Sequence, residues 1–211
     1  MCYNFRMIKP MTKYAQCAAL VATLFAYPSF AKNTIIKEAS GVVVEAKPVK
    51  GSVDELFAVG EFDAPPEKVF ALLWDITAQK EFMAPVKDAT NISKGTTSRV
   101  DHIVFYGGVI GLKDRDVVSE TTIKEKTSQK IRLRFKQKES IGPAPSDDYV
   151  RLTLREGGWD LTAIDEGTRT RAEFRIHTDP GINLGNKLAH SFGAKTIIGV
   201  FEAMRAKLKK G

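Results

Sequence analysis

The sequence predicts an α+β fold in which a curved antiparallel β-sheet wraps around a long C-terminal α-helix. Residues 41–62 favour two strands, and residues 66–76 favour an amphipathic helix. Residues 87–177 predict a series of consecutive strands, and residues 184–208 have the pattern of one long helix. An antiparallel sheet with its helices on one face is α+β, and curling the sheet around the last helix buries the apolar sides of both.

The first 31 residues predict a cleaved secretory signal peptide. Lys13 precedes an apolar run over 15–27, and a small-residue pattern ending at Ala31 follows it. The run is shorter than the roughly 20 residues that a spanning helix needs, so an uncleaved anchor is the weaker alternative. We therefore expect a leader over 1–31 and one domain over 32–211, located in the periplasm or, alternatively, secreted.

The composition suits a globular domain and excludes several classes of protein. The chain has 43% hydrophobic and 27% charged residues and a net charge of +7. Without the leader there remain 29 Lys and Arg against 25 Asp and Glu, a net charge of +4, which is too small for a nucleic-acid clamp. Cys2 and Cys17 both lie in the leader, so the mature chain is expected to have no disulfide and no thiolate metal site. We expect no metal and no cofactor.

The first part of the domain combines strands with a helix. Residues 41–47 and 55–62 read as two strands joined by a turn. Pro66 suits the first position of a helix, where the missing N–H has no partner to lose. Four apolar residues then recur at helical spacing: Val69, Leu72, Leu73 and Ile76. We expect this helix to close one end of the curled sheet.

The middle of the chain predicts an antiparallel meander. Three segments are rich in β-branched and aromatic residues: 99–106, 116–125 and 130–137. In 170–177, apolar residues alternate with charged ones, which also predicts a strand. In 130–137, apolar and basic residues alternate, which gives one apolar and one basic face. Residues 139–148 read as a loop. After it the apolar positions change from even to odd numbers at Gly157 and Gly158, which predicts a bulge or a hairpin there.

The last helix is amphipathic along its whole predicted length. Its basic C-terminal residues suit the negative end of the helix dipole. Its apolar side consists of Leu184, Leu188, Phe192, Ile197, Ile198, Phe201, Met204 and Leu208.

Five sequence elements in this order resemble the START (StAR-related lipid-transfer) family, within the Bet v 1-like helix-grip (SRPBCC) superfamily. They are "GVVVEAKPV" from 41, "FDAPPEKVFALLWDI" from 62 with "FMAPVKDA" from 82, "DRDVVSE" from 114, "EGGWDLTAI" from 156 and "HTDPGINLGNKLAHSF" from 177. The resemblance covers about Ile36 to the C-terminus and implies a bulge within one long strand at Gly157 and Gly158. One departure is "GGVIGLK" at 107–113, where many bacterial relatives have a Trp-Pro pair, so the entrance geometry is not carried over.

The resemblance implies a carrier that holds one lipid or other hydrophobic small molecule in an apolar cavity between the sheet and the C-terminal helix. Burying an acyl chain gains about 0.8 kcal/mol per CH₂ relative to water, and a bilayer offers nearly the same, so the ligand can be exchanged. We expect the following residues at the ligand: Phe105, Tyr106, Arg115, Val118, Glu120, Leu133, Leu152, Trp159, Phe174, Leu188, Phe192, Ile198 and Phe201.

Several polar features leave alternatives open. Arg115 and Asp116 fit a buried ion pair or a polar hook at the ligand, and equally a structural salt bridge. His102 is a weaker candidate for a ligand contact, and the sequence does not decide which side of 99–106 faces inward. Basic residues on the sheet can form a patch for anionic membranes, but such alternation is more often the solvent-exposed side of a sheet.

An enzyme and a structural protein are the competing functions. Aromatase/cyclases of the wider superfamily use cavity carboxylates, Tyr and Arg, and Glu120, Tyr106 and Arg115 can serve here, although their spacing does not demand it. A structural partner in an envelope complex would have a filled core. We expect a monomeric carrier without catalysis, with transient membrane-surface contact and no nucleic-acid partner.

Overall fold

The computed structural model describes residues 33–107, 113–179 and 185–210. The strands are β1 (Thr34–Ala39), β2 (Val42–Lys47), β3 (Glu55–Phe62), β4 (Val86–Lys94), β5 (Ser98–Phe105), β6 (Asp114–Lys126), β7 (Lys130–Gln137), β8 (Tyr149–Arg151), β9 (Thr153–Ile164) and β10 (Arg169–Asp179). The helices are α1 (Pro66–Trp74), α2 (Gln79–Phe82), the short 3₁₀ helix η1 (Asp165–Gly167) and α3 (Gly185–Leu208). The expected leader over 1–31 and Leu184 lie outside the described residues.

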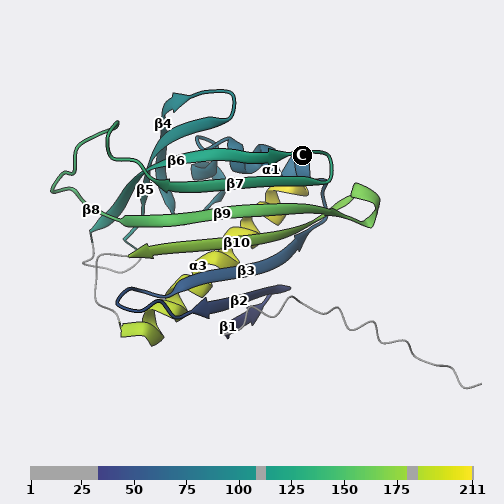
Figure 1. Ribbon diagram of the computed structural model, residues 1–211, viewed down its shortest axis with the longest axis horizontal. Coiled ribbons are helices and arrows are strands. Elements are labelled where there is room, and N and C mark those ends of the chain that lie inside the picture. Colours follow the sequence, from purple (N-terminus) through teal and green to yellow (C-terminus); the bar gives the residue numbers. More distant parts are fainter. Residues whose placement is uncertain (1–32, 108–112, 180–184, 211) are drawn as a thin grey trace, which may run out of the picture. The chain divides into compact units, whose positions relative to one another are not determined.

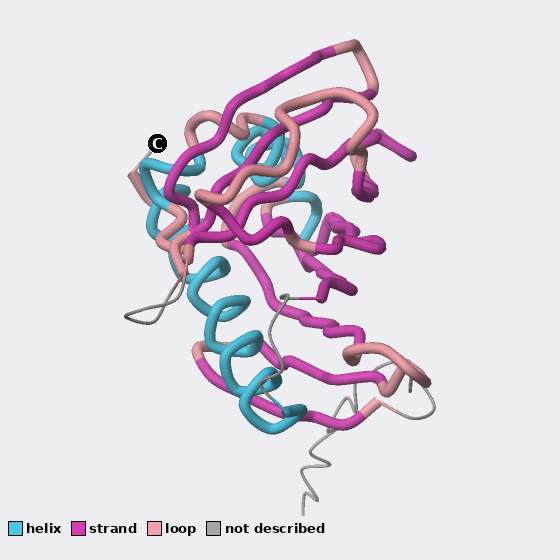
Figure 2. The backbone as a smooth tube through the Cα atoms, turned by 90° about the vertical axis from the view of Figure 1, so that its left-hand side faces the viewer, coloured by secondary structure: helices cyan, strands magenta, loops and turns pink. Residues whose placement is uncertain are grey.

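The ten strands of the described chain form one sheet (Figure 1). Its order is β1-β2-β3-β10-β9-β7-β6-β5-β4, with antiparallel neighbours throughout, and the short β8 pairs in parallel with β6. Helix α3 lies along one face of the curved sheet (Figure 2). The predicted α+β fold, an antiparallel sheet that grips a long C-terminal helix, is therefore confirmed.

The two adjacent prolines form the joint between strand and helix. Pro65 is extended, with φ −60° and ψ 152°, because the ring of the following proline disfavours the helical region, and Pro66 occupies the first turn of α1. Val69 and Leu73 are buried and hold α1 against the core. The helix ends at Trp74, and α2 follows as a separate short helix that the sequence pattern did not distinguish.

The cross-strand register defines the inner face of the sheet, the face that carries α3. Trp159 on β9 stands opposite Leu133 on β7 and Phe174 on β10, and its ring centroid lies 5.3 Å from that of Phe201 on α3. Side chains alternate between the faces of a strand, so the register assigns every other residue of each strand to this face. Its most deeply buried members, with their partners on α3, are Val42, Val44, Phe62, Ile131, Leu133, Leu161, Phe201 and Met204.

Strand β9 is one long strand with a bulge at Arg155. On β10, His177 pairs with Glu156 but Thr178 pairs with Leu154, so Arg155 is the extra residue. The predicted bulge is therefore present, two residues before Gly157, and the hairpin alternative is wrong. The sequence pattern did not indicate β1 and did not delimit β4.

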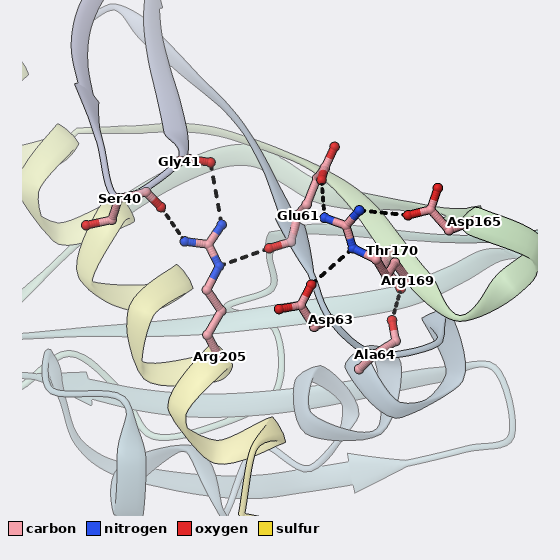
Figure 3. A network of polar contacts seen from close by, with 9 residues as sticks. All are labelled: Ser40, Gly41, Glu61, Asp63, Ala64, Asp165, Arg169, Thr170 and Arg205. Atoms are coloured by element: carbon pink, nitrogen blue, oxygen red, sulfur yellow. Dashed lines mark hydrogen bonds and ion pairs between the residues drawn. The ribbon is translucent and has the colours of Figure 1, made fainter.

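Arg205 fixes the second half of α3 to the sheet (Figure 3). Arg205 donates hydrogen bonds to the carbonyl oxygens of Glu61 (2.9 Å), Ser40 (2.5 Å) and Gly41 (3.5 Å). Nearby, Arg169 on β10 contacts the carboxylates of Glu61, Asp63 and Asp165. The C-terminal part of the helix is thus held to the β1–β2 turn and to β3. Within the described residues, no helix is long and apolar enough to cross a membrane.

Candidate functional site

A row of aromatic rings crosses the inner face from α3 towards β7. Phe62 and Phe201 stack with centroids 5.3 Å apart, and Trp159 lies 5.3 Å from Phe201. Phe174 lies 4.6 Å from Trp159, and Phe135 lies 6.4 Å from Phe174. The first three rings are buried, whereas Phe174 and Phe135 are only partly buried. The row therefore passes from the closed core to a part of the inner face that keeps accessible surface.

Partly buried apolar side chains gather on the inner face away from α3. Helix α3 packs mainly against β1, β2, β3 and the helices α1 and α2. The register places the remaining apolar side chains on the inner face of β5, β6, β7 and β10. We name the following set the apolar inner region: Ile103, Phe105, Ile123, Phe135, Phe174 and Ile176. Apolar surface that a fold turns inward but leaves accessible is typical of ligand sites.

The structure brings together seven of the predicted ligand residues. Five of the seven lie on strands, and the register places their side chains on the inner face of the sheet. The other two lie on α3 and belong to the core that packs against this face. The seven are Phe105, Arg115, Leu133, Trp159, Phe174, Ile198 and Phe201. Of these, Phe105 and Phe174 are in the apolar inner region, and Leu133, Trp159, Ile198 and Phe201 are buried in the core. Phe135 is a further member of the apolar inner region that was not among the predicted ligand residues, although the alternation over 130–137 places it on the apolar side of its strand.

Val118 and Glu120 lie on the opposite, outer face, which corrects their expected place at the ligand. Their strand neighbour Val117 is the residue that faces inward, opposite Ile103. Val118 is fully buried because the loop that contains Gly142 packs against it. The approach is so close that a Cβ atom added to Gly142 would lie 3.1 Å from Cγ1 of Val118. Glu120 lies 3.8 Å from Lys138. Both Val117 and Val118 are buried, so the alternation of apolar residues could not distinguish the two faces of β6.

Three other predicted ligand residues are exposed to solvent. Leu188 and Phe192, in the first half of α3, are 55% and 46% exposed, and from residue 187 onward the first buried side chain of this helix is Ala194. Tyr106 is 56% exposed. Leu152 is half-buried between β8 and β9, where its N–H donates to a carbonyl of β6. None of these four residues belongs to the apolar inner region.

The inner face also carries a buried ion pair that the sequence pattern did not predict. Arg99 Nε lies 2.5 Å from Asp101 Oδ2, and the amide of Asn91 donates to the other oxygen of Asp101 at 2.8 Å. Arg99 also donates to the carbonyl oxygens of Leu73 (3.0 Å) and Trp74 (2.5 Å), at the C-terminal end of α1. The pair therefore fastens α1 to β5. Asp101, Ile103 and Phe105 alternate along the strand, so the sequence predicts that they share one face. Only the pairing of β5 with β6 shows that this face is the inner one.

Arg115 and Asp116 do not pair with each other, because consecutive strand residues point to opposite faces. Asp116 lies on the outer face, where Arg151 donates two hydrogen bonds of 2.9 Å to its carboxylate and His102 lies at 2.8 Å. Burial disfavours the charged carboxylate, but these hydrogen bonds outweigh burial, and the pKa of Asp116 lies below its ordinary value. His102 is thus part of an outer-face network and does not face the apolar inner region.

Arg115 itself is buried on the inner face, opposite Phe105. Its Nη1 donates to the carbonyl oxygens of Lys113 (2.6 Å) and Gly107 (3.3 Å), at the two ends of the β5–β6 connection. Of the three polar residues considered for cyclase chemistry, Arg115 faces inward, Glu120 faces outward and Tyr106 is exposed, so they do not converge on one point. Within the described ranges, no three His, Cys, Asp or Glu side chains gather in a way that could hold a metal ion.

Carboxylates balance most of the basic residues that the sequence predicts on the outer face. Arg134 lies 2.6 Å from Asp160, and Arg132 lies 3.5 Å from the same carboxylate. Further pairs are Arg151 with Asp116, Arg171 with Glu173, and Arg175 with Glu156. This face therefore has the mixed charge of an ordinary solvent-exposed sheet surface rather than a positive patch.

Comparison with known proteins gives the same architecture. The family model described as "Polyketide cyclase / dehydrase and lipid transport" matches residues 62–205. The STAR-related lipid transfer protein of Xanthomonas axonopodis has a TM-score of 0.72 at 20% identity, over 84% of this chain and 98% of that chain. Human StAR-related lipid transfer protein 5 has a TM-score of 0.75 at 18% identity, over 87% and 89%.

An enzyme is also among the similar structures. The Zhui aromatase/cyclase of Streptomyces sp. R1128 has a TM-score of 0.52 at 12% identity, over 74% of this chain and 93% of that chain. No curated protein sequence matches the chain. At such identities, the structural similarities show the fold alone.

Proposed function

The chain belongs to the polyketide cyclase/dehydrase and lipid transport family, and we propose that it binds one hydrophobic small molecule, such as a lipid, on the inner face of its sheet and carries it through water. The observation that carries this proposal is the apolar inner region. Its six side chains are turned inward by the register yet remain only partly buried. A bound apolar molecule would remove this surface from water at roughly 25 cal/mol per Å².

The aromatic row supports the same function. Phe174 and Phe135 contribute ring surface to the apolar inner region. Trp159 contacts Phe174 from the core side, and Phe201 contacts Trp159 in turn. A ligand placed there would contact apolar side chains that already pack against one another, and less ordering would be needed on binding. Binding is favoured over cyclase chemistry because the candidate acid–base residues lie on different faces of the sheet.

We propose the first half of α3 as the place of membrane contact during ligand exchange. Leu188 and Phe192 are one helical turn apart and exposed, and the exposed Lys187 and Lys195 flank them. Apolar side chains next to cations suit a surface of anionic lipids. Sedimentation with vesicles that contain phosphatidylglycerol tests this: L188S/F192S is expected to lose most of the bound fraction. Unchanged binding of this variant would contradict it.

The predicted leader over 1–31 adds a cellular location to the proposal. If it is removed on export, the mature protein works in the periplasm as a carrier between membrane surfaces. Fractionation of the native cells with N-terminal sequencing of the recovered protein tests this, with the mature N-terminus expected at Lys32. Recovery of an uncleaved chain from the membrane fraction would favour the anchor alternative.

The central experiment is native mass spectrometry of the protein purified from its own cells, followed by organic extraction. We expect a monomer with one hydrophobic molecule, and release of that molecule on denaturation. A protein that is empty and also takes up no fluorescent lipid would contradict the carrier function. Recovery of a chemically altered molecule after incubation with the extracted compound would support the enzyme instead.

A matched pair of variants locates the site. Phe174→Ala removes a ring from the apolar inner region, whereas Phe57→Ala removes a half-buried ring from the outer face of β3. We expect the affinity for a fluorescent lipid to fall about tenfold in F174A, as for the loss of a large apolar contact, and to stay near the wild-type value in F57A. Equal affinities of the two variants would place the ligand elsewhere.

A further inference from the structure

Arg115 is a cation held inside the protein on the ligand side of the sheet. It is 7% exposed and stands opposite Phe105, next to Ile103 on the same face. A buried guanidinium costs several kcal/mol unless a negative charge and hydrogen bonds compensate it. The residues that surround Arg115 therefore indicate whether the protein itself supplies that compensation.

The two aspartates beside Arg115 already have cations of their own. Lys87 Nζ lies 2.6 Å from Asp114 Oδ2, and Arg151 makes two hydrogen bonds to Asp116 on the outer face. Throughout the described part of the chain, no carboxylate lies within the 4.0 Å of an ion pair with Arg115. The hydrogen bond from Lys87 and, to a smaller extent, the charge of Arg115 lower the pKa of Asp114, so this carboxylate interacts with Arg115 at longer range while its ion pair is with Lys87. Arg115 therefore has no ion-pair partner of its own among the described residues.

The hydrogen bonds of Arg115 are also incomplete. A guanidinium has five N–H donors, and here Nη1 alone donates to other described residues, to the carbonyl oxygens of Lys113 and Gly107. The contrast with Arg99 is clear. That arginine, on the same face, has the carboxylate of Asp101 and two helix-end carbonyls as partners. Arg99 has a full set of protein partners, whereas Arg115 has no ion-pair partner and its Nε and Nη2 donate to no described residue.

We propose that Arg115 binds the head group of the ligand and that the ligand is an acidic amphiphile, an apolar chain that ends in a single carboxylate or phosphate. This inference rests on the proposed function and names its ligand class. The planar fork of a guanidinium matches both anions. Phe105 and Ile103 place the start of the apolar inner region beside it, so the head group and the chain have adjacent sites.

The test compares ligands that differ only at the head: palmitate, hexadecyl phosphate and methyl palmitate, each displacing a neutral fluorescent apolar probe from the full-length protein at pH 8. A charge-assisted hydrogen bond is worth enough to make at least one of the two acids bind roughly ten- to hundredfold more tightly than the ester. Of palmitate and hexadecyl phosphate, the acid with the larger affinity relative to methyl palmitate identifies the head group as carboxylate or phosphate.

Variants of the arginine complete the test. R115Q is expected to bind acid and ester equally, and R115K is expected to keep part of the preference. R155Q removes the same charge from an exposed position on β9 and is expected to keep the wild-type ratio. Circular dichroism shows whether R115Q folds. If it does not, the ratio of acid affinity to ester affinity, measured for the wild type and for R115K, still tests the proposal.

Two results would overturn the inference while the carrier function stands. One is equal binding of ester and acids by the wild type, and the other is an unchanged ratio in a folded R115Q. Displacement of palmitate by equimolar acetate or inorganic phosphate would also overturn it, because the site would then recognise a free anion. If the protein does not take up the fluorescent probe and none of the three compounds binds, the proposed function itself would be refuted.

Discussion

Replacing Asp101 by asparagine tests the buried ion pair that joins β5 to α1. The side chains of Arg99 and Asp101 are 4% and 1% exposed, so water cannot compensate for the loss of either charge. Both oxygens of Asp101 accept hydrogen bonds, one from Arg99 and one from Asn91, and an amide can offer only one oxygen to these two donors. D101N therefore leaves an unbalanced buried cation and one unsatisfied donor.

The expected cost of D101N is about 3–5 kcal/mol in the free energy of unfolding, the usual range for a buried ion pair that loses one partner. The total stability of a domain is only about 5–15 kcal/mol, so the transition in urea should move far towards lower concentration. The measurement is equilibrium unfolding in urea, followed by tryptophan fluorescence. Trp74 lies 4.7 Å from the Arg99 guanidinium and should report the change directly.

Strand β10 offers a matched control. Arg171 and Glu173 are also two residues apart on one strand and form an ion pair, but on the outer face, at 27% and 38% exposure. E173Q should cost less than about 1 kcal/mol, because solvent screens an exposed pair. If D101N is destabilised by no more than E173Q, the assignment of a buried, stability-determining pair is refuted. A double variant R99M/D101L that is more stable than D101N alone would support it, since both charges are then removed together.

Three further predictions concern other parts of the fold. Gly157→Ala should lose about 1–3 kcal/mol of stability in urea, because its Cβ would lie 2.0 Å from the ring of Phe135, and Phe135→Leu should restore part of the loss. Arg205→Met should lower the stability by roughly 2 kcal/mol, because it removes hydrogen bonds to three carbonyls, while Lys209→Met should have little effect on the thermal transition. The pKa of Asp116 is lowered in the folded protein, so its stabilising effect is complete above the ordinary value of 3.8 and is lost as the pH falls through the lower, folded value. Asp116→Asn should therefore flatten the acid side of the stability profile, and an unchanged slope in acid urea titrations would contradict this.

Local patterns in the sequence were sufficient for most elements of the fold. The Pro65–Pro66 pair predicts the start of α1 because proline acts on its own and its neighbour's dihedral angles, without help from tertiary contacts. Alternation over 130–137 predicts β7 and its apolar side because only one set of residues there is apolar. The change of parity near Gly157 predicts the bulge, although the bulged residue is Arg155.

The orientation of the polar residues depended on tertiary structure. On β6, residues are buried on both faces, since the apolar inner region and the rest of the core lie on one side and the loop that contains Gly142 covers Val118 on the other. A period of two cannot distinguish two buried faces, so Val118 and Glu120 were expected on the wrong one. The partner of Asp116 is Arg151, 35 residues later, which the parallel pairing of β8 with β6 brings alongside.

The sequence by itself thus determined the order of most elements and the positions that carry large apolar side chains, because these depend on dihedral preferences and periodicity within a few residues. The fold family followed from the resemblance of five sequence elements to a known family. The tertiary structure alone decided which of these positions form the partly open inner surface and which charges remain unbalanced there. Both depend on strand register and on what packs over each face, and these are properties of residues far apart in the chain. Arg99 and Arg115 illustrate this, since both arginines face inward and only the first meets a carboxylate.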